Sequence, residues 1–106
     1  MTELHPVMNN TKWRELRAAM YAIRPAAKYR SMYINGHYSA VDSEWFYHFR
    51  EGGYDNIQYV DIFAKDSLHR QRIANALKAI HLPGEETGDG FRVYGYALPG
   101  QVIDYL

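Results

Sequence analysis

The chain has 106 residues, and its twelve basic and twelve acidic side chains cancel, so no global field favours nucleic acid or an anionic membrane. With 47% hydrophobic residues, this length accommodates one domain with one core. Cysteine is absent, which excludes disulfides, thiol nucleophiles and thiolate metal sites. The first ten residues lack the pattern of a secretion signal, and no apolar run approaches the roughly 18 residues of a membrane span, so a cytoplasmic protein is expected.

The N-terminal part predicts an arm followed by a helix. Residues 1–8 lack a periodic pattern and are expected to form a flexible arm, with a single domain over residues 9–106. The side chains of Asn9 to Thr11 can accept the free N–H groups at a helix start. Apolar residues then recur at spacings of three, four and three, on one helical face: Trp13, Leu16, Met20 and Ile23. Pro25 disfavours helical geometry at the residue before it, so the helix should end near there.

Four strands are predicted after this helix. Residues 29–34 and 37–41 flank Asn35-Gly36, the preferred pair for a two-residue type I′ turn, and should form a hairpin. Residues 44–50 and 56–64 should form a second hairpin across a Gly-Gly turn. The aromatic run in the first strand of this second hairpin would then lie at the centre of the sheet.

The rest of the chain predicts a second helix and two more strands. Asp66 or Ser67 can cap a helix with an apolar face, and residues 82–90 are typical of an acidic, glycine-rich loop. Strands are expected at 91–97 and 102–106. The element order is therefore α-β-β-β-β-α-β-β, and short links between consecutive strands favour antiparallel pairing. We expect an α+β fold in which two helices pack on one face of an antiparallel sheet.

Alternation along the second hairpin gives the predicted sheet two apolar faces. The face toward the helices should carry Trp45, Tyr47, Phe49, Gln58, Val60 and Ile62. The other face should carry Phe46, His48, Ile57, Tyr59 and Asp61, joined by Tyr94 and Tyr96. Tyrosine is enriched at interfaces because it buries a large ring and keeps a hydroxyl group. Three explanations for an aromatic outer face stay open: a covering arm or loop, a homodimer or partner interface, and a small-molecule pocket.

Few residues are candidates for chemistry. Glu44 and Asp61 should lie opposite each other, where two carboxylates can bind a divalent cation or share a proton, although a solvated hairpin end explains them more simply. His48 is the best placed of the five histidines. No ligand spacing or nucleophile motif accompanies it, which favours a structural role, and no cofactor or metal is expected. The acidic loop carries three side chains that would steer a basic partner: Glu85, Glu86 and Asp89.

Two stretches carry a resemblance. Asn9-Asn10-Thr11-Lys12-Trp13 at the start of the first helix, and the run from Glu44 to Phe49 followed by Glu51-Gly52-Gly53-Tyr54, resemble a family of short uncharacterised bacterial proteins. The resemblance covers roughly residues 9–64. It implies no catalytic residues, because that family has no established activity. In size and build the chain is similar to immunity proteins that neutralise bacterial toxins, an analogy of class and not of motif.

The leading hypothesis is a cytoplasmic protein-binding domain, in particular an immunity protein for a bacterial toxin domain. One alternative is a small enzyme or ligand-binding domain that uses His48 and Tyr59, and another is an obligate homodimer. A protein partner or a second copy is expected, and neither a membrane nor nucleic acid is. The residues expected to contact the partner are Phe46, His48, Tyr59, Tyr94, Tyr96, Glu85, Glu86 and Asp89.

Overall fold

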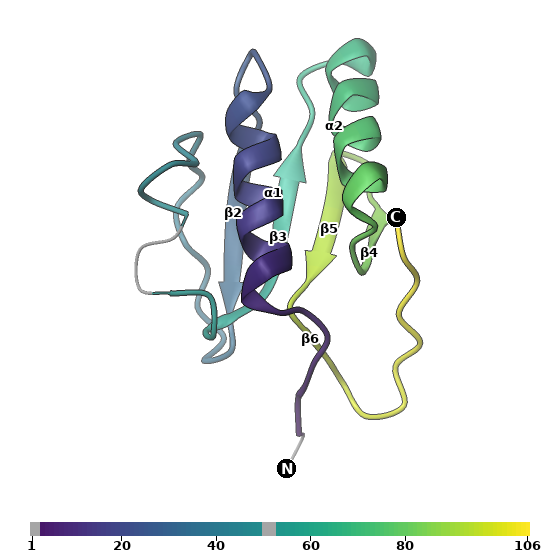
Figure 1. The fold of residues 1–106 in the computed structure, drawn as a ribbon. Helices are drawn as coiled ribbons and strands as arrows, with labels where there is room; N and C mark the ends of the chain where they lie inside the picture. Colours follow the sequence, from purple (N-terminus) through teal and green to yellow (C-terminus); the bar gives the residue numbers. More distant parts are fainter. Residues whose placement is uncertain (1–2, 50–52) are drawn as a thin grey trace.

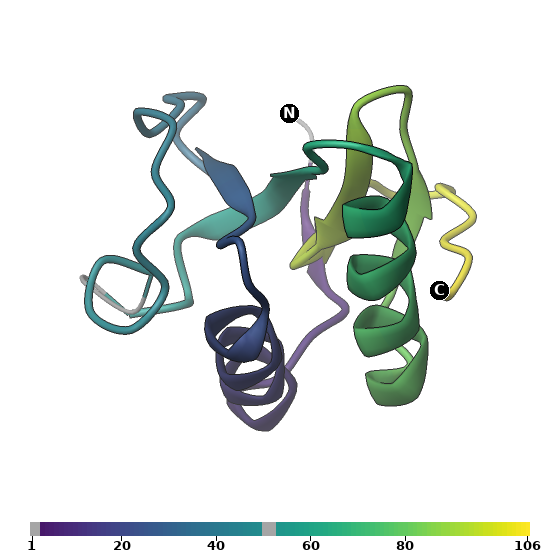
Figure 2. The same cartoon turned by 90° about the horizontal axis from the view of Figure 1, so that it is seen from above.

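The computed structural model describes residues 3–49 and 53–106. Its elements in chain order are β1 (His5–Pro6), α1 (Asn10–Ala22), β2 (Lys28–Tyr33), β3 (Ile57–Phe63), α2 (Ser67–Ile80), β4 (Gly84–Glu86), β5 (Gly90–Tyr94) and β6 (Tyr96–Ala97). One antiparallel sheet has the order β2-β3-β5-β4, and β1 pairs with β6 separately. Both helices lie side by side on one face of the four-stranded sheet (Figures 1 and 2). The expected α+β fold, with two helices on one face of an antiparallel sheet, is confirmed.

The two helices lie where capping and proline chemistry predict them. The side chains of Asn9 and Asp66 each accept a backbone N–H of the first helical turn at 2.8 Å. α1 ends at Ala22, shortly before Pro25. α2 ends before His81, which adopts the left-handed conformation with φ 64° and donates its N–H back into the helix. Local signals in the sequence therefore locate both helices.

The core lies between the helices and the inner face of the sheet. Its main side chains come from α1, β3, α2 and β5: Trp13, Leu16, Met20, Val60, Ile62, Ile73, Leu77, Phe91 and Val93. Complete burial of one such side chain contributes about 1.5–3 kcal/mol relative to exposure. Val60 and Ile62 face the helices as alternation predicts. The predicted outer position of Ile57 is wrong, because the register between β2 and β3 shifts near Tyr33 and turns Ile57 into the core, where it is 2% exposed.

The aromatic run after Glu44 is not the predicted central strand but a series of turns between β2 and β3. The Glu44 carboxylate accepts the backbone N–H groups of the second, third and fourth residues after it at 2.8–2.9 Å. Those donors are therefore not available to a strand ladder. Trp45 and Phe49, four residues apart, both enter the core, with exposed fractions of 1% and 3%. The predicted inner position of Tyr47 is wrong, because this side chain is 62% exposed.

Three other predicted strands differ from the structure. Residues 37–41 form no strand, and only two isolated bridges tie residues 38 and 42 to β2. The Asn35-Gly36 turn exists, but it is not type I′, because only its glycine has a positive φ. Residues 91–97 divide into β5 and β6, and β4 occupies part of the predicted acidic loop. Residues 104–106 run beside Leu82 to Gly84 through backbone hydrogen bonds, without forming a strand of their own.

The N-terminal arm contacts the far end of the chain. His5 and Pro6 pair with Ala97 and Tyr96, and the N–H of Val7 donates to the carbonyl of Gly95 at 2.9 Å. This small sheet lies beyond the N-terminal end of α1, below the main sheet in Figure 1. The flexibility predicted for residues 1–8 stays a prediction.

The corrected position of the aromatic run has a consequence for stability. Trp45→Ala should lower the free energy of unfolding by about 3–5 kcal/mol, because it empties a core site and removes the indole N–H bond to the Ala27 carbonyl at 2.8 Å. Tyr47→Ala should cost less than about 1 kcal/mol, because its ring is mostly in water. Urea unfolding of both variants measures the difference. Equal costs would favour the alternating strand over the observed turns.

Candidate functional site

The open sheet face is the side of the four-stranded sheet that points away from both helices (Figure 2). No helix covers it within residues 3–49 and 53–106. Side chains alternate along a strand, so the neighbours of the buried Val60, Ile62 and Val93 point to this side. The open sheet face carries Arg30 and Met32 from β2, Tyr59 and Asp61 from β3, Arg92 and Tyr94 from β5, Glu85 from β4, and Tyr38 from the segment after β2.

Four charged residues form a row across this face. Arg30 pairs with Asp61, Asp61 with Arg92, and Arg92 with Glu85 in the registers of neighbouring strands. We call these four residues the charge row; their signs alternate from β2 to β4. At its centre, Nε and Nη2 of Arg92 donate to the two carboxylate oxygens of Asp61 at 2.7 and 3.2 Å. Nη2 of Arg30 lies 3.8 Å from the same carboxylate.

Asp61 decides the electrostatics of the row. It is only 7% exposed, and a carboxylate so far removed from water is stable only when it is paired and hydrogen-bonded. The hydrogen bond from Arg92 to Asp61 raises the pKa of Arg92 further above its ordinary value. The central pair is therefore a fixed ion pair, while the two ends of the row, Arg30 and Glu85, lie on the outer strands.

Tyrosine rings hold the two guanidinium groups in place. The guanidinium carbon of Arg30 lies 3.9 Å from the ring centre of Tyr38, and that of Arg92 lies 4.0 Å from the ring centre of Tyr59. The hydroxyl groups of the two tyrosines are 2.6 Å apart. Burial and this hydrogen bond raise the pKa of Tyr59 to about 12. The guanidinium groups of Arg30 and Arg92 thus each have a defined position on the face.

The fourth strand is joined to this network through Tyr94. Its hydroxyl donates to Oε1 of Glu85 at 2.7 Å, and its ring meets that of Tyr59 at 66° with centres 6.2 Å apart. Burial, followed by the bond to Glu85, raises the pKa of Tyr94. All four strands therefore contribute side chains to one connected surface of arginine, tyrosine and carboxylate groups.

His48 lies in a second polar cluster, in the loop between β2 and β3. Its Nδ1 is 2.7 Å from Oδ2 of Asp42 and 3.9 Å from Oε2 of Glu44. Burial alone would raise the pKa of Asp42, but hydrogen bonds from the Glu44 amide and from His48 outweigh it, so the pKa is lowered. The three amides that Glu44 accepts, the His48 amide first, lower its pKa as well. Both carboxylates therefore stay ionised, and His48 donates its Nδ1 proton to Asp42.

A pocket of about 250 Å³ opens beside this loop. Asp42 and His48 contribute to its wall, together with four hydroxyl-bearing residues: Tyr29, Ser31, Tyr33 and Ser39. Ser39 is engaged locally, because its hydroxyl accepts the Ser31 N–H at 2.9 Å and donates to the Ala40 carbonyl at 3.1 Å. The arrangement fixes the loop against β2.

Comparison with models of protein families gives a match over most of the chain. The model of DUF6678, a family of unknown function, matches residues 1–100. The chain belongs to this family. No curated protein and no solved structure matches it. The match fits the expected uncharacterised domain, and within the described residues of this family member neither helix is long and apolar enough to cross a membrane.

The eight residues predicted to contact a partner do not share one surface in this DUF6678 member. Tyr59, Tyr94 and Glu85 lie together on the open sheet face. Phe46 does not, because it packs against α1, with its ring 5.3 Å from that of Tyr21 and 4.5 Å from the Arg17 guanidinium. The predicted outer-face position of Phe46 and His48 is therefore wrong, since both belong to the loop between β2 and β3.

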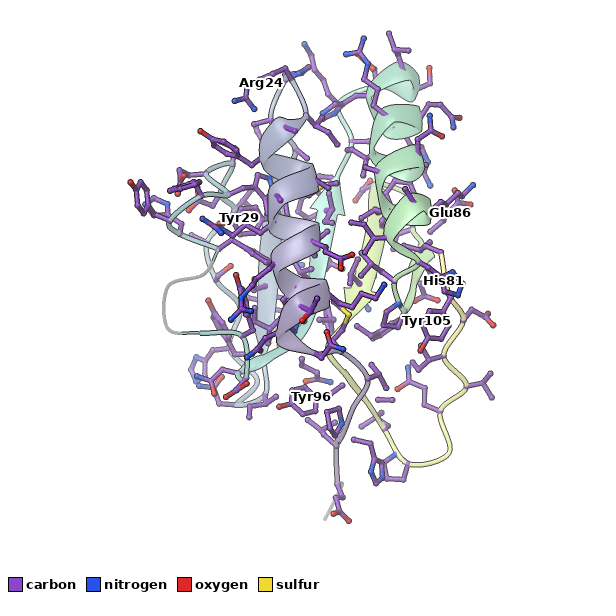
Figure 3. The ribbon with its side chains drawn as sticks, viewed as in Figure 1. Arg24, Tyr29, His81, Glu86, Tyr96 and Tyr105 are labelled. Carbon is purple, nitrogen blue, oxygen red and sulfur yellow. The ribbon has the colours of Figure 1, made fainter. Side chains whose placement is uncertain are left out.

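The remaining predicted contacts lie at the periphery. Tyr96 is in β6, where its hydroxyl donates to the Asp55 carbonyl at 2.8 Å, near the N-terminal strand (Figure 3). Glu86 pairs with Phe91, a helix-side position of β5, and its side chain lies at the outer edge beside α2 (Figure 3). Asp89 precedes β5, and its carbonyl accepts the Ala64 N–H. These three residues do not extend the open sheet face.

The two residues named in the enzyme hypothesis lie in different parts of the structure. His48 lines a pocket with Tyr29 and Ser31, whereas Tyr59 belongs to the open sheet face. Glu44 and Asp61 are not opposed either, because Asp61 pairs with Arg30 and Arg92 while Glu44 accepts amides of its own loop. The predicted carboxylate pair is therefore wrong.

The sequence interpretation misses four residues of the face: Arg30, Met32, Tyr38 and Arg92. A signal for Arg92 is present, because it lies two residues before Tyr94 and so shares its side of the strand. The same alternation within residues 29–34 predicts that Arg30 and Met32 lie on the same side of their strand. Tyr38 has no such signal, since it reaches the face from outside the sheet.

Alkaline titration tests the tyrosine network. Because the folded-state pKa of Tyr59 is raised from 10.0 to about 12, its contribution to stability is complete below about pH 10 and is lost as the pH rises toward 12. Tyr38→Phe removes the hydrogen bond and should move this titration toward the ordinary value. Phenolate absorbance of the variant and of Tyr59→Phe identifies the transition. Tyr21→Phe, on α1 at the other side of the sheet, should leave it in place. A Tyr59 transition unchanged by Tyr38→Phe would contradict the network.

Acid titration tests the loop that holds Trp45. The pKa values of Asp42 and Glu44 are lowered from ordinary values of 3.8 and 4.5, so their contribution is present at neutral pH and is lost as the pH falls below about 4.5. In Glu44→Gln the free energy of unfolding should therefore decrease less between about pH 5 and pH 3 than it does in the wild type. Urea unfolding across this range, with the exposed Glu86→Gln as control, measures the slope. If the unfolding free energy falls equally with pH in the wild type, Glu44→Gln and Glu86→Gln, the hydrogen bonds from the amides to Glu44 are not formed in solution.

Proposed function

We propose that this chain is a cytoplasmic protein-binding domain that docks through its open sheet face, and that its partner is a bacterial toxin domain that it neutralises. The observation that carries the proposal is the connected surface of Arg30, Tyr38, Tyr59, Asp61, Arg92, Tyr94 and Glu85. Tyrosine and arginine are among the side chains most enriched in the energetic centres of protein interfaces. Here they lie on the one face of the sheet that neither helix covers (Figure 2).

Preorganisation supports docking at this face. The stacking of Arg30 on Tyr38 and of Arg92 on Tyr59, at 3.9 and 4.0 Å, restricts side chains that are otherwise rich in rotamers. Ordering such a side chain on association costs about 0.5–1.5 kcal/mol, and this cost is reduced when the free domain already holds it. The face is therefore better suited to binding than an equal area of mobile arginine and tyrosine.

The charge pattern supports a protein partner over a polyanion. The two arginines of the charge row are balanced by two carboxylates in the same row, so the row carries no excess positive charge that a phosphate backbone could neutralise. A surface with alternating charges instead selects a partner with the complementary pattern. The toxin assignment rests on the analogy of size and build with immunity proteins, and the cysteine-free sequence is consistent with the cytoplasm.

Co-expression tests the proposal. The protein encoded next to this chain in its genome should inhibit growth when expressed alone, and this chain should restore growth and co-purify with it. Tyr59→Ala should weaken the complex roughly tenfold or more, as for a central interface aromatic, and calorimetry gives the dissociation constant. If the neighbouring product neither inhibits growth nor binds, the immunity function is wrong.

Two matched variants locate the surface. Tyr21→Ala removes a tyrosine that is 47% exposed on α1, on the side of the sheet that the helices cover, and it should leave the affinity unchanged. Phe46→Ala tests the loop beside α1, where the sequence predicts a contact. Loss of binding in Phe46→Ala but not in Tyr59→Ala would move the docking surface to that loop.

A further inference from the structure

The charge row has a symmetry that goes beyond neutrality. From β2 to β4 its signs are positive, negative, positive and negative, contributed by Arg30, Asp61, Arg92 and Glu85. When this row is placed against a reversed copy of itself, a positive charge faces a negative charge at each of the four positions. A surface with this property can bind a second copy of the same surface.

The geometry of such a pair follows from the order of the strands. Two copies can meet face to face about a two-fold axis that lies between the sheets, perpendicular to the charge row, and one row then runs opposite to the other. Arg30 faces Glu85 of the second copy, and the fixed ion pair of Asp61 and Arg92 faces the same pair of the second copy in the opposite order. An axis along the row would instead place each charge against its own equivalent, which is repulsive. Only the first orientation satisfies all four positions.

A neighbouring row of one methionine and two tyrosines agrees with the same axis. Met32, Tyr59 and Tyr94 pair across β2, β3 and β5 and form a parallel row two residues from the charge row. The axis perpendicular to the charge row runs parallel to the strands. Rotation about it therefore leaves this second row at the same position along the strands. Tyr59 of one copy therefore meets Tyr94 of the other, so apolar surface faces apolar surface where charge faces charge.

We propose that two copies of this chain associate through their open sheet faces about a two-fold axis perpendicular to the charge row. The interface is isologous, so each favourable contact between Arg30 and Glu85 occurs twice. The inference does not rest on the proposed function, because self-association is measured on the chain alone. It gives the open sheet face a definite occupant when no other partner is present.

The area of the face sets the strength of this dimer. Four strands about 4.8 Å apart and about five residues long, at about 3.4 Å per residue, span roughly 320 Å². A standard stable interface covers about 800 Å² on each partner. Arg30 and Arg92 are already paired with Asp61 within each copy, and Glu85 accepts the Tyr94 hydroxyl, so these charges contribute more to orientation than to affinity. The dimer is therefore weak and reversible.

Complementary charge reversal tests the arrangement. Sedimentation equilibrium of the wild-type chain, up to about 1 mM, should show a mean mass that rises with concentration. Arg30→Glu alone, and Glu85→Arg alone, should each weaken self-association roughly tenfold or more, because each creates two like-charge contacts across the axis. An equimolar mixture of the two variants should associate again, because in the mixed pair every position of the row faces its opposite sign.

Association in the mixture would not be explained by a restored contact between Arg30 and Glu85 within one molecule. Arg30 and Glu85 lie on the two outer strands of the sheet, about 14 Å apart at three strand spacings, and in the mixture the two substitutions are on different molecules. Arg14→Glu, an exposed reversal on α1, is the matched control and should leave the wild-type association unchanged. Thermal unfolding of each variant identifies a loss of folding.

Chemical-shift changes with concentration give a readout that needs no variant. In the wild-type chain they should be confined to β2, β3, β5, β4 and the segment around Tyr38, and be absent from α1 and α2. A monomer at every concentration would overturn the proposal, as would shifts confined to the helices. Failure of the two reversed variants to associate on mixing would overturn the proposed axis, and the proposed toxin complex would still be judged by its own test.

Discussion

The arrangement of the sheet depends on one carboxylate. Asp61 lies in the middle strand pair, 7% exposed, and an unpaired charge in that position would cost several kcal/mol. The bidentate contact from Arg92 removes this cost and requires β3 and β5 to meet in one register. On the β2 side of β3, Arg30 lies 3.8 Å from the same carboxylate, which favours one register between β2 and β3 as well. The ion pairs are thus a constraint on strand pairing more than a source of stability.

The same register also sets the core. Val60 and Ile62 flank Asp61 in sequence and point to the helices, so a shift of one residue would exchange them for Asp61 and Tyr59. The carboxylate would then enter an apolar core and the aliphatic side chains would enter water. Core packing and the charge row therefore select the same pairing. This agreement explains how a strand with a buried carboxylate can lie near the centre of a small sheet.

The parts of the fold that the sequence predicts are those with local causes. Caps at Asn9 and Asp66 and the spacing of apolar residues locate both helices, and alternation assigns Val60 and Ile62 to the core. The loop after β2 escapes prediction because the apolar run there has the composition of a strand, whereas the Glu44 side chain takes up the amides. The error then spreads, because a false hairpin partner for β3 assigns Glu44 to a position opposite Asp61.

The candidate surface is harder to predict than the fold, since it depends on pairing between distant strands. Tyr59, Tyr94 and Glu85 follow from alternation and composition. Arg30 and Arg92 join them only when β2 and β5 are known to flank β3, and sequence spacing does not reveal those neighbours. The charges in the row of this face sum to zero yet occupy fixed positions, so the binding proposed for it would discriminate between partners by pattern and not by total charge. In the proposed dimer, weak pairing with a second copy would shield the tyrosine rings without closing the surface permanently, and the proposed partner would replace the second copy by mass action. The alternation that fixes the strand register therefore also determines which surfaces can bind to the sheet.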